Sequence, residues 1–273
     1  MKILPAAQAF DAIAPHYDAL YGPAANAVMA WMHEENLALL RAAFPAGSHL
    51  LEIGCGTGDE ALALARAGYT VLATDISPRM AALTQTKART AGLLDHIVAL
   101  ALPGRALSAL RPKQPFDGAY ASFGSLNCET DLPAVAAALA RLVRPGGVFV
   151  CSVMSRYYLA EVAWFLLHAR PRMALRRWRR GWQAASVGEW SGDQIGVRTR
   201  YLTASCLAHT FASAFAVEQV LALPLLLPPP YLDALFRRRR ALFRRWERWE
   251  RRLRARWPWQ HLGDHLVVVL RRI

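Results

Sequence analysis

The chain has 273 residues, 54% of them apolar, which excludes global disorder and suits one large α/β domain. Its formal net charge of +13 is concentrated in two stretches. Residues 170–180 hold six arginines and no acid, and residues 235–256 hold eleven arginines against two glutamates. The remainder carries a net charge of −2, so the basicity is a local feature that needs its own explanation.

Cysteine and histidine patterns argue against a metal or redox site. The four cysteines stand singly, as in a reduced cytoplasmic protein, and the histidines form no ligand-like pair, so we expect no metal. The N-terminal segment is too interrupted for a signal peptide, and no apolar run is long enough to span a bilayer. We therefore expect a cytoplasmic location, with peripheral membrane contact left open.

Strands and helices alternate through the first 155 residues. In chain order we expect a strand at 49–54, a helix at 59–67, a strand at 69–75, a helix at 77–91, strands at 96–102 and 116–122, a helix at 131–142 and a strand at 148–153. This order predicts a mostly parallel sheet with helices on both faces.

The pattern changes after residue 155. We expect in turn an apolar helix at 157–168, a basic helix at 173–182, a hairpin with strands 185–190 and 195–201 around Ser191-Gly192-Asp193, a helix at 203–213, a strand at 217–223, an Arg/Trp-rich helix at 235–257 and a last strand at 265–270. The later elements partly restore the α/β alternation.

The first strand runs into Gly54-Cys55-Gly56-Thr57-Gly58. Glycines at such a turn let a ligand approach the backbone, and the following helix offers free N–H groups at its start. Asp75 ends the next strand, where an acid accepts hydrogen bonds from ribose hydroxyls. The pattern predicts a nucleoside cofactor.

A dinucleotide-binding domain is the main competitor. Its GxGxxG fingerprint is not matched, because position 59 is Asp. An acid so close to the helix start would repel a pyrophosphate, whereas Glu52 beneath the loop could attract an ammonium group. These charges favour a cationic or neutral group there, as in S-adenosylmethionine (SAM).

Several motifs resemble class I SAM-dependent methyltransferases. LLEIGCGTGDEALALA and VLATDIS resemble the first two motifs, FDAIAPHYD the FDxxAxxYD segment of the small-molecule branch, and FDG, SFGSLN and LARLVRPGGVFVCSV the fourth- and fifth-strand motifs. The resemblance covers about residues 8–155 and resumes at the final strands. It implies a doubly wound, seven-stranded Rossmann-like α/β sheet, SAM as cofactor, and methyl transfer by in-line displacement.

The resemblance also implies a set of cofactor-binding residues, which are Tyr17, Glu52, Gly54, Cys55, Gly56, Thr57, Asp75, Ile76, Ala101, Leu102, Ser122 and Phe123. The loop backbone, Ser122 and Phe123 would contact the methionine part, Asp75 the ribose and Ile76 the adenine. The acid that the family often has after the third strand is absent, so backbone groups near Ala101 and Leu102 would take its place.

Structural alternatives stay open for several residues. Asp75 could be a solvent-facing acid, Glu52 a carboxylate bonding the loop amides, and Tyr17 a core residue rather than a lid, with Tyr21 beside it. Asp117 is interpreted as structural, and Cys55 is disfavoured as a nucleophile. No catalytic residue is assigned; the candidates for a general base are His16, His209, His265, Asn127 and Glu129.

The resemblance divides a single domain, residues 1–273, into an N-terminal helical lid (1–48), a SAM-binding core (49–154), a cover insertion (155–202) and a C-terminal part (203–273). In the cover, Tyr157, Tyr158, Trp164 and Phe165 would line an acceptor pocket or simply pack on the core. Apolar residues at 235, 242, 246, 249, 253 and 257 form one helical stripe. That helix could be docked and solvated, lie on a membrane, or face nucleic acid, which its two glutamates disfavour.

We therefore expect a methyltransferase acting on an apolar or acidic small-molecule or lipid-like acceptor. The alternatives are a non-catalytic SAM-fold scaffold at a membrane surface and an RNA methyltransferase. The absence of an NPPY-type tetrapeptide after the fourth strand argues against adenine or glutamine N-methylation. The acceptor atom and the oligomeric state are not assigned.

Overall fold

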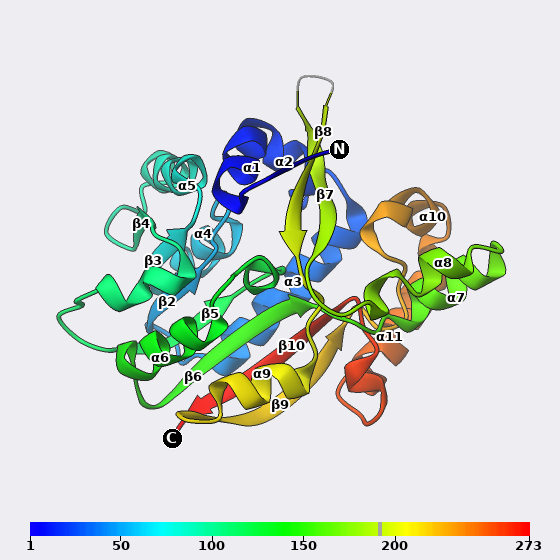
Figure 1. Ribbon diagram of the computed structural model, residues 1–273. Helices are drawn as coiled ribbons and strands as arrows, with labels where there is room; N and C mark the ends of the chain where they lie inside the picture. The colour runs from blue at the N-terminus through cyan, green and yellow to red at the C-terminus, as the bar shows by residue number, and fades with distance from the viewer. Residues whose placement is uncertain (191–192) are drawn as a thin grey trace.

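The computed structural model describes residues 1–190 and 193–273 (Figure 1). The strands of its main sheet are β2 (His49–Ile53), β3 (Thr70–Asp75), β4 (Ile97–Ala101), β5 (Phe116–Ala121), β6 (Val143–Met154), β9 (Phe215–Leu223) and β10 (His265–Arg272). Their order is β4-β3-β2-β5-β6-β10-β9, and only β10 runs antiparallel to its neighbours. The expected doubly wound, mostly parallel α/β fold is confirmed.

Helices cover both faces of this sheet. The helices of one face are α3 (Ala27–Ala43), α4 (Asp59–Ala65) and α5 (Pro78–Thr90), and those of the other are α6 (Leu132–Leu142) and α9 (Ala204–Phe211), with the short helix η2 (Gly104–Ala109). Leu50 packs in the first core and Leu51 in the second, because successive side chains of a strand point to opposite faces. The apolar run of β2 is thus buried on both sides.

A smaller sheet lies beside the N-terminal helices. Its strands are β1 (Lys2–Leu4), β7 (Gln183–Trp190) and β8 (Asp193–Thr199), in the order β1-β8-β7. It packs on α1 (Ala6–Ile13), which leads through η1 (Ala14–His16) into α2 (Tyr17–Tyr21) (Figure 1). The predicted hairpin is confirmed, although Ser191 and Gly192 of its turn lie outside the described residues. The N-terminal segment and the cover therefore form one unit.

The predicted basic helix at 173–182 is wrong. The chain instead forms α8 (Pro171–Ala174) and η4 (Arg176–Trp178), and then enters β7. Arg176 and Arg177 both turn toward Glu161 of α7 (Leu159–Leu167), a convergence that a regular helix would not give to adjacent side chains. Two short helical turns, the second held by ion pairs to Glu161, thus stand where a single helix was expected.

The single helix predicted at 235–257 is also wrong. It is divided into α10 (Asp233–Arg238) and α11 (Arg240–Leu253), with a break at Arg239. The packed face is not the predicted stripe, because Phe236, Phe243 and Glu250 are buried at seven-residue intervals. The exposed large apolar residues of this region include Leu242, Trp246, Trp249 and Trp257.

The remaining short helices are η3 (Ser125–Asn127), η5 (Pro230–Leu232) and η6 (Trp259–His261). In the described part of the chain, no helix combines the length and apolar character needed to span a bilayer.

Candidate active site

The glycine loop joins β2 to α4 at the carboxyl edge of the main sheet. Gly54, Gly56 and Gly58 all have positive φ, a conformation that favours glycine. A Cβ on Gly54 would lie 2.2 Å from the Ser125 Cβ, and one on Gly58 would lie 2.7 Å from the Thr84 Cγ2. These two glycines are therefore required by packing within the protein.

Gly56 has a different environment. A Cβ there would have only one neighbour within 4 Å, the Tyr17 ring at 3.8 Å. The loop thus approaches open space at Gly56 and nowhere else among its three glycines. This is the position at which a ligand could lie against the backbone, and it fits the methionine part of SAM.

Asp75 fastens the loop to the start of α5. Its Oδ2 accepts from the Gly56 N–H at 2.9 Å, and its Oδ1 accepts from the Ser77 N–H at 2.8 Å. Burial raises the pKa of Asp75 to about 6, although the two N–H donors oppose this rise. Each carboxylate oxygen can accept a further hydrogen bond, as contact with a ribose diol requires.

The floor of the site is acidic. Glu52 is fully buried, and its Oε2 has no hydrogen-bond partner among the described residues. Burial raises the pKa of Glu52 well above its ordinary value, and Glu60 adds to this effect. Asp59 and Asp75 also lie near enough to act on Glu52. Such a floor suits a cationic ligand and opposes a pyrophosphate.

The N-terminal segment closes over the loop. The Thr57 hydroxyl donates to Asp18 Oδ1 at 2.5 Å, and Lys87 Nζ lies 2.7 Å from Asp18 Oδ2. Tyr17 lies over Gly56, and its ring centroid is 5.1 Å from that of Tyr21. The segment therefore occupies the place expected of a lid, while its contact with a cofactor stays a prediction.

The adenine side lies between β3 and β4. The Leu102 N–H donates to the Asp75 carbonyl at 2.7 Å, and Ala101 pairs with Asp75 across the two strands. Ile76 follows Asp75 and is half-buried. The sequence-predicted residues for ribose and adenine thus share one edge.

Phe123 marks the acceptor side, just beyond β5. It has a φ of 48°, and its ring centroid lies 4.4 Å from that of His33 and 5.9 Å from that of His265. Ser122 is held by a hydrogen bond from the Asn36 amide at 3.0 Å. Sequence analysis did not single out His33, because nothing in α3 announces a contact with a residue 90 positions away.

A buried ion cluster lies behind His265. Asp264 Oδ2 lies 3.0 Å from His265 Nδ1, and Asp264 Oδ1 lies 2.6 Å from Arg177 Nη2. Arg177 also binds Glu161 Oε2 at 2.8 Å. Burial alone would raise the pKa of Asp264, but Arg177 and His265 outweigh it and hold the pKa well below its ordinary value. Asp264 is therefore ionised and orients the His265 ring.

Two of the base candidates have structural roles. The Asn127 amide bonds the backbone of Met154 and Arg200, and Glu129 accepts from the N–H groups of Arg105 and Thr130.

The other candidates differ in position. His209 is exposed on α9 and His16 ends η1, whereas His265 begins β10 at the carboxyl edge of the parallel strands.

Asp117 accepts from the His49 N–H and pairs with Arg144, in keeping with a structural role. Burial raises the pKa of the Cys55 thiol well above its ordinary value, which opposes its use as a nucleophile.

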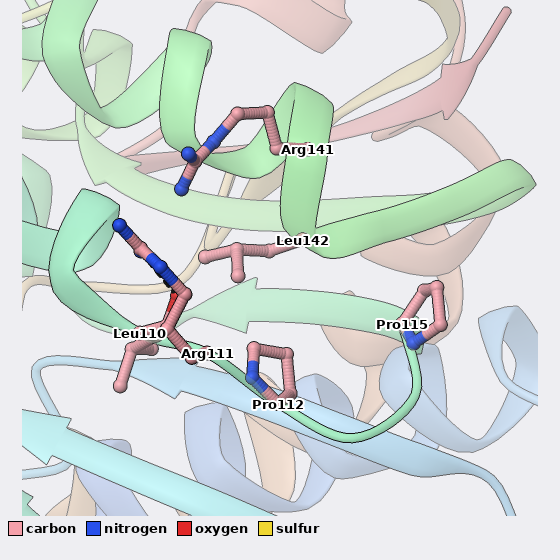
Figure 2. A pocket seen from close by; sticks show the side chains of 6 residues that line it. All are labelled: Leu110, Arg111, Pro112, Pro115, Arg141 and Leu142. Atoms are coloured by element: carbon pink, nitrogen blue, oxygen red, sulfur yellow. Dashed lines mark hydrogen bonds between the residues drawn. The ribbon is translucent and has the colours of Figure 1, made fainter.

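Two surface pockets lie away from the glycine loop. One pocket lies where β5 begins and α6 ends, at the opposite edge of the sheet from the glycine loop, and is lined by Leu110, Arg111, Pro112, Pro115, Arg141 and Leu142 (Figure 2). Another lies beyond β6 and is lined in part by Arg156, Tyr157 and His261. Of the expected acceptor residues, Tyr157 lines this second pocket, whereas Tyr158 and Phe165 are buried in the fold.

Known proteins share this core. Residues 50–147 match the family of the methyltransferase domain. The chain is 30% identical over 154 residues to a demethylmenaquinone methyltransferase of Symbiobacterium thermophilum, which covers 54% of this chain and 58% of the relative. Residues 50–147 are thus similar to a methyltransferase domain.

Two further proteins are similar to this chain in sequence or in fold. A SAM-dependent Diels-Alderase, iccD, of Talaromyces variabilis is 35% identical over 120 residues, which are 44% of this chain and 40% of that protein. The CcbJ methyltransferase of Streptomyces caelestis shares the fold, with a TM-score of 0.63 over 97% of both chains at 17% identity. The chain spans less than two thirds of the length of these curated relatives.

The comparisons and the site agree on the cofactor. The segment that matches the methyltransferase domain contains the glycine loop and Asp75, and the acidic floor with an open Gly56 fits the charge and shape of SAM. SAM was the cofactor expected from the sequence.

Proposed function

We propose that this chain catalyses transfer of a methyl group from SAM to an apolar small-molecule acceptor of the quinol type. The observation that carries the proposal is the glycine loop, open only at Gly56 and tied to the buried Asp75 carboxylate. The demethylmenaquinone relative supports the acceptor class.

The residues of the site would hold the cofactor by complementary charge. SAM supplies an electrophilic methyl group when it is bound. Asp75 would accept the ribose hydroxyls, and Tyr17 would exclude water above the loop. Glu60 would provide negative potential below the loop, and a bound cation would favour the ionised form of the buried Glu52 carboxyl. Because the protein has mainly to align the reactants, few catalytic groups are needed.

His265 is the proton acceptor that we propose for the acceptor hydroxyl. The ionised Asp264 favours a proton on Nδ1, which leaves Nε2 as the basic nitrogen. Nε2 forms no hydrogen bond with a described residue, and the ring adjoins Phe123 on the acceptor side. Removal of a phenolic proton raises the nucleophilicity of the acceptor.

We also propose contact between α11 and an anionic membrane surface, which would concentrate a lipid-like acceptor. The support is the exposed face of α11, where arginines alternate with Trp246 and Trp249. A scaffold without catalysis and an RNA methyltransferase remain the alternatives, and the iccD relative adds a SAM-dependent cyclase.

The test is transfer of radioactive methyl from labelled SAM to two probes, reduced demethylmenaquinone and a catechol-type quinol. We expect label in the organic phase with at least one probe, and its loss in a folded Gly56→Val variant. A chain that binds SAM but transfers no methyl group to either probe or to a host lipid extract would contradict the proposal. That result would favour the scaffold or cyclase alternative.

A further inference from the structure

Helix α7 has the reverse of the usual polarity of a surface helix. Leu159, Ala163, Leu166 and Leu167 are exposed, and their spacing places them on one face. The one charged residue of the helix, Glu161, is 1% exposed and points inward. A solvated helix normally places apolar residues inside and charge outside. The outward face of α7 therefore has the composition of a surface that is covered in use.

The apolar surface continues past the end of α7. Met173 of α8, Trp178 of η4 and Leu175 between these two helices are exposed. Among the exposed apolar residues of α7 and this stretch, Leu167 has the largest exposed fraction, 84%. Figure 1 shows α7 and α8 projecting from the body of the protein, far from α5 and β4. The projection thus presents apolar side chains at its tip.

Cationic side chains surround this apolar surface. Four exposed arginines lie in the projection or directly after it, namely Arg170, Arg172, Arg179 and Arg180. None of them forms an ion pair with a described residue, and Glu161 is the only acid between positions 156 and 188. Since Glu161 is already paired with Arg176 and Arg177, the outer surface carries positive charge alone.

The projection is firmly held at its base. Arg177 joins Glu161 of α7 to Asp264, the residue before β10. The Tyr158 hydroxyl donates to the Leu227 carbonyl at 2.5 Å, and the rings of Phe165 and Tyr231 stack at 6.3 Å between centroids. The exposed leucines therefore belong to a fixed element rather than to a frayed end.

We infer that the projection formed by α7, α8 and η4 (residues 159–178) inserts its apolar face into the surface of an anionic lipid bilayer. Leucines and a tryptophan surrounded by unpaired arginines match the two layers of such a surface, acyl chains beneath anionic head groups. A protein partner would need acidic groups around an apolar groove, and nucleic acid would leave the leucines uncovered. The docking does not depend on the proposed methyl transfer.

The same cluster that holds the projection also orients His265. Arg177 contacts Asp264, and Asp264 contacts the His265 ring. A bilayer bound at α7 would thus lie close to the acceptor side of the site. This geometry suits an acceptor that stays dissolved in the lipid, which is the part of the inference that rests on the proposed function.

Co-sedimentation with vesicles tests the docking directly. The full chain is mixed with vesicles of phosphatidylcholine alone and of phosphatidylcholine with phosphatidylglycerol. We expect binding to the anionic vesicles, and a loss of at least about tenfold in partitioning for Leu166→Ser/Leu167→Ser. Leu94→Ser, which alters an exposed leucine at the turn after α5, should stay within about twofold of wild type.

Further variants separate this surface from α11. Arg237–Arg240 changed to Gln should weaken binding only at low salt, whereas the leucine variant should remain weak at high salt. Because both leucines are exposed, the variant should keep the wild-type circular dichroism spectrum, and Leu167→Ser alone provides a milder replacement. Wild-type partitioning by the leucine variant would overturn the inference. Absence of vesicle binding, or a wild-type dimer that these substitutions dissociate, would do so as well.

Discussion

The cofactor side and the cover of this protein hold their buried charges in different ways. Asp75 is held by backbone N–H groups of Gly56 and Ser77, close in sequence or on the adjoining loop. Glu161 and Asp264 are held by the side chain of Arg177, which joins segments 87 positions apart. The first arrangement needs only a correct backbone, whereas the second needs three side chains to meet.

The difference teaches where mutations should harm stability and where they should harm binding. A carboxylate bound by backbone groups keeps its partners when neighbouring side chains change. A carboxylate bound by one arginine loses its main partner in a single substitution, and an uncompensated buried charge is costly.

The largest effect should follow removal of that arginine. Arg177→Met should lower the free energy of unfolding by about 3–5 kcal/mol, because Asp264 loses its cationic partner in a buried site. Arg176→Met is the matched control, since Arg176 is more exposed and Glu161 keeps Arg177. Urea unfolding measures both variants. An equal loss of unfolding free energy in the two variants would show that the ion cluster around Asp264 and Glu161 does not depend on Arg177.

On the cofactor side we expect a substitution to cost less free energy, and to lower the affinity for SAM rather than the stability of the fold. Gly56→Val should weaken SAM binding by at least about a hundredfold while the fold persists, because the added side chain fills the open space beneath Tyr17. Gly47→Val is the control, at a turn with positive φ and no neighbour within 4 Å of a Cβ. Isothermal titration calorimetry gives both affinities. Normal binding by the Gly56 variant would place the ligand elsewhere.

The same contrast explains which parts were predictable from sequence. The strands from β2 to β6 follow from short apolar runs, and the first of these runs leads directly into the glycine loop. Both signals are contained in a few neighbouring residues. Asp75 was identified for the same reason, since its place at a strand end is a local property.

The structure of the cover and of α11 could not be predicted from neighbouring residues alone. The arginines near 176 are helix formers, so the sequence favoured a helix, but their convergence on Glu161 is decided by a fold that no local pattern records. In α11 the tryptophans suggested the packed face, yet the buried residues are Phe236 of α10 and Phe243 and Glu250 of α11. Glu250 accepts hydrogen bonds from the N–H groups of Leu225 and Leu226, which lie far from it in the sequence. The contact of His33 with Phe123 has no local signal at all.

The central claim is that Asp75 and the glycine loop bind SAM, and calorimetry at two pH values tests it most directly. Because burial raises the pKa of Asp75 to about 6, the carboxylate is ionised at pH 7.5 and largely protonated at pH 5. The account predicts binding at pH 7.5 that weakens by up to about tenfold at pH 5, as the acceptor for the ribose hydroxyls is lost.

The stability of the unliganded protein should change in the opposite direction. Because the pKa of Asp75 in the folded chain lies above the ordinary 3.8, its carboxylate destabilises the fold above pH 6, and protonation removes this effect as the pH falls through 6. Asp75→Asn should bind SAM at least about tenfold more weakly than wild type at pH 7.5 and show little of the pH dependence. A folded chain that gives no heat of binding with SAM, or an Asp75→Asn variant that binds as wild type does, would contradict the claim.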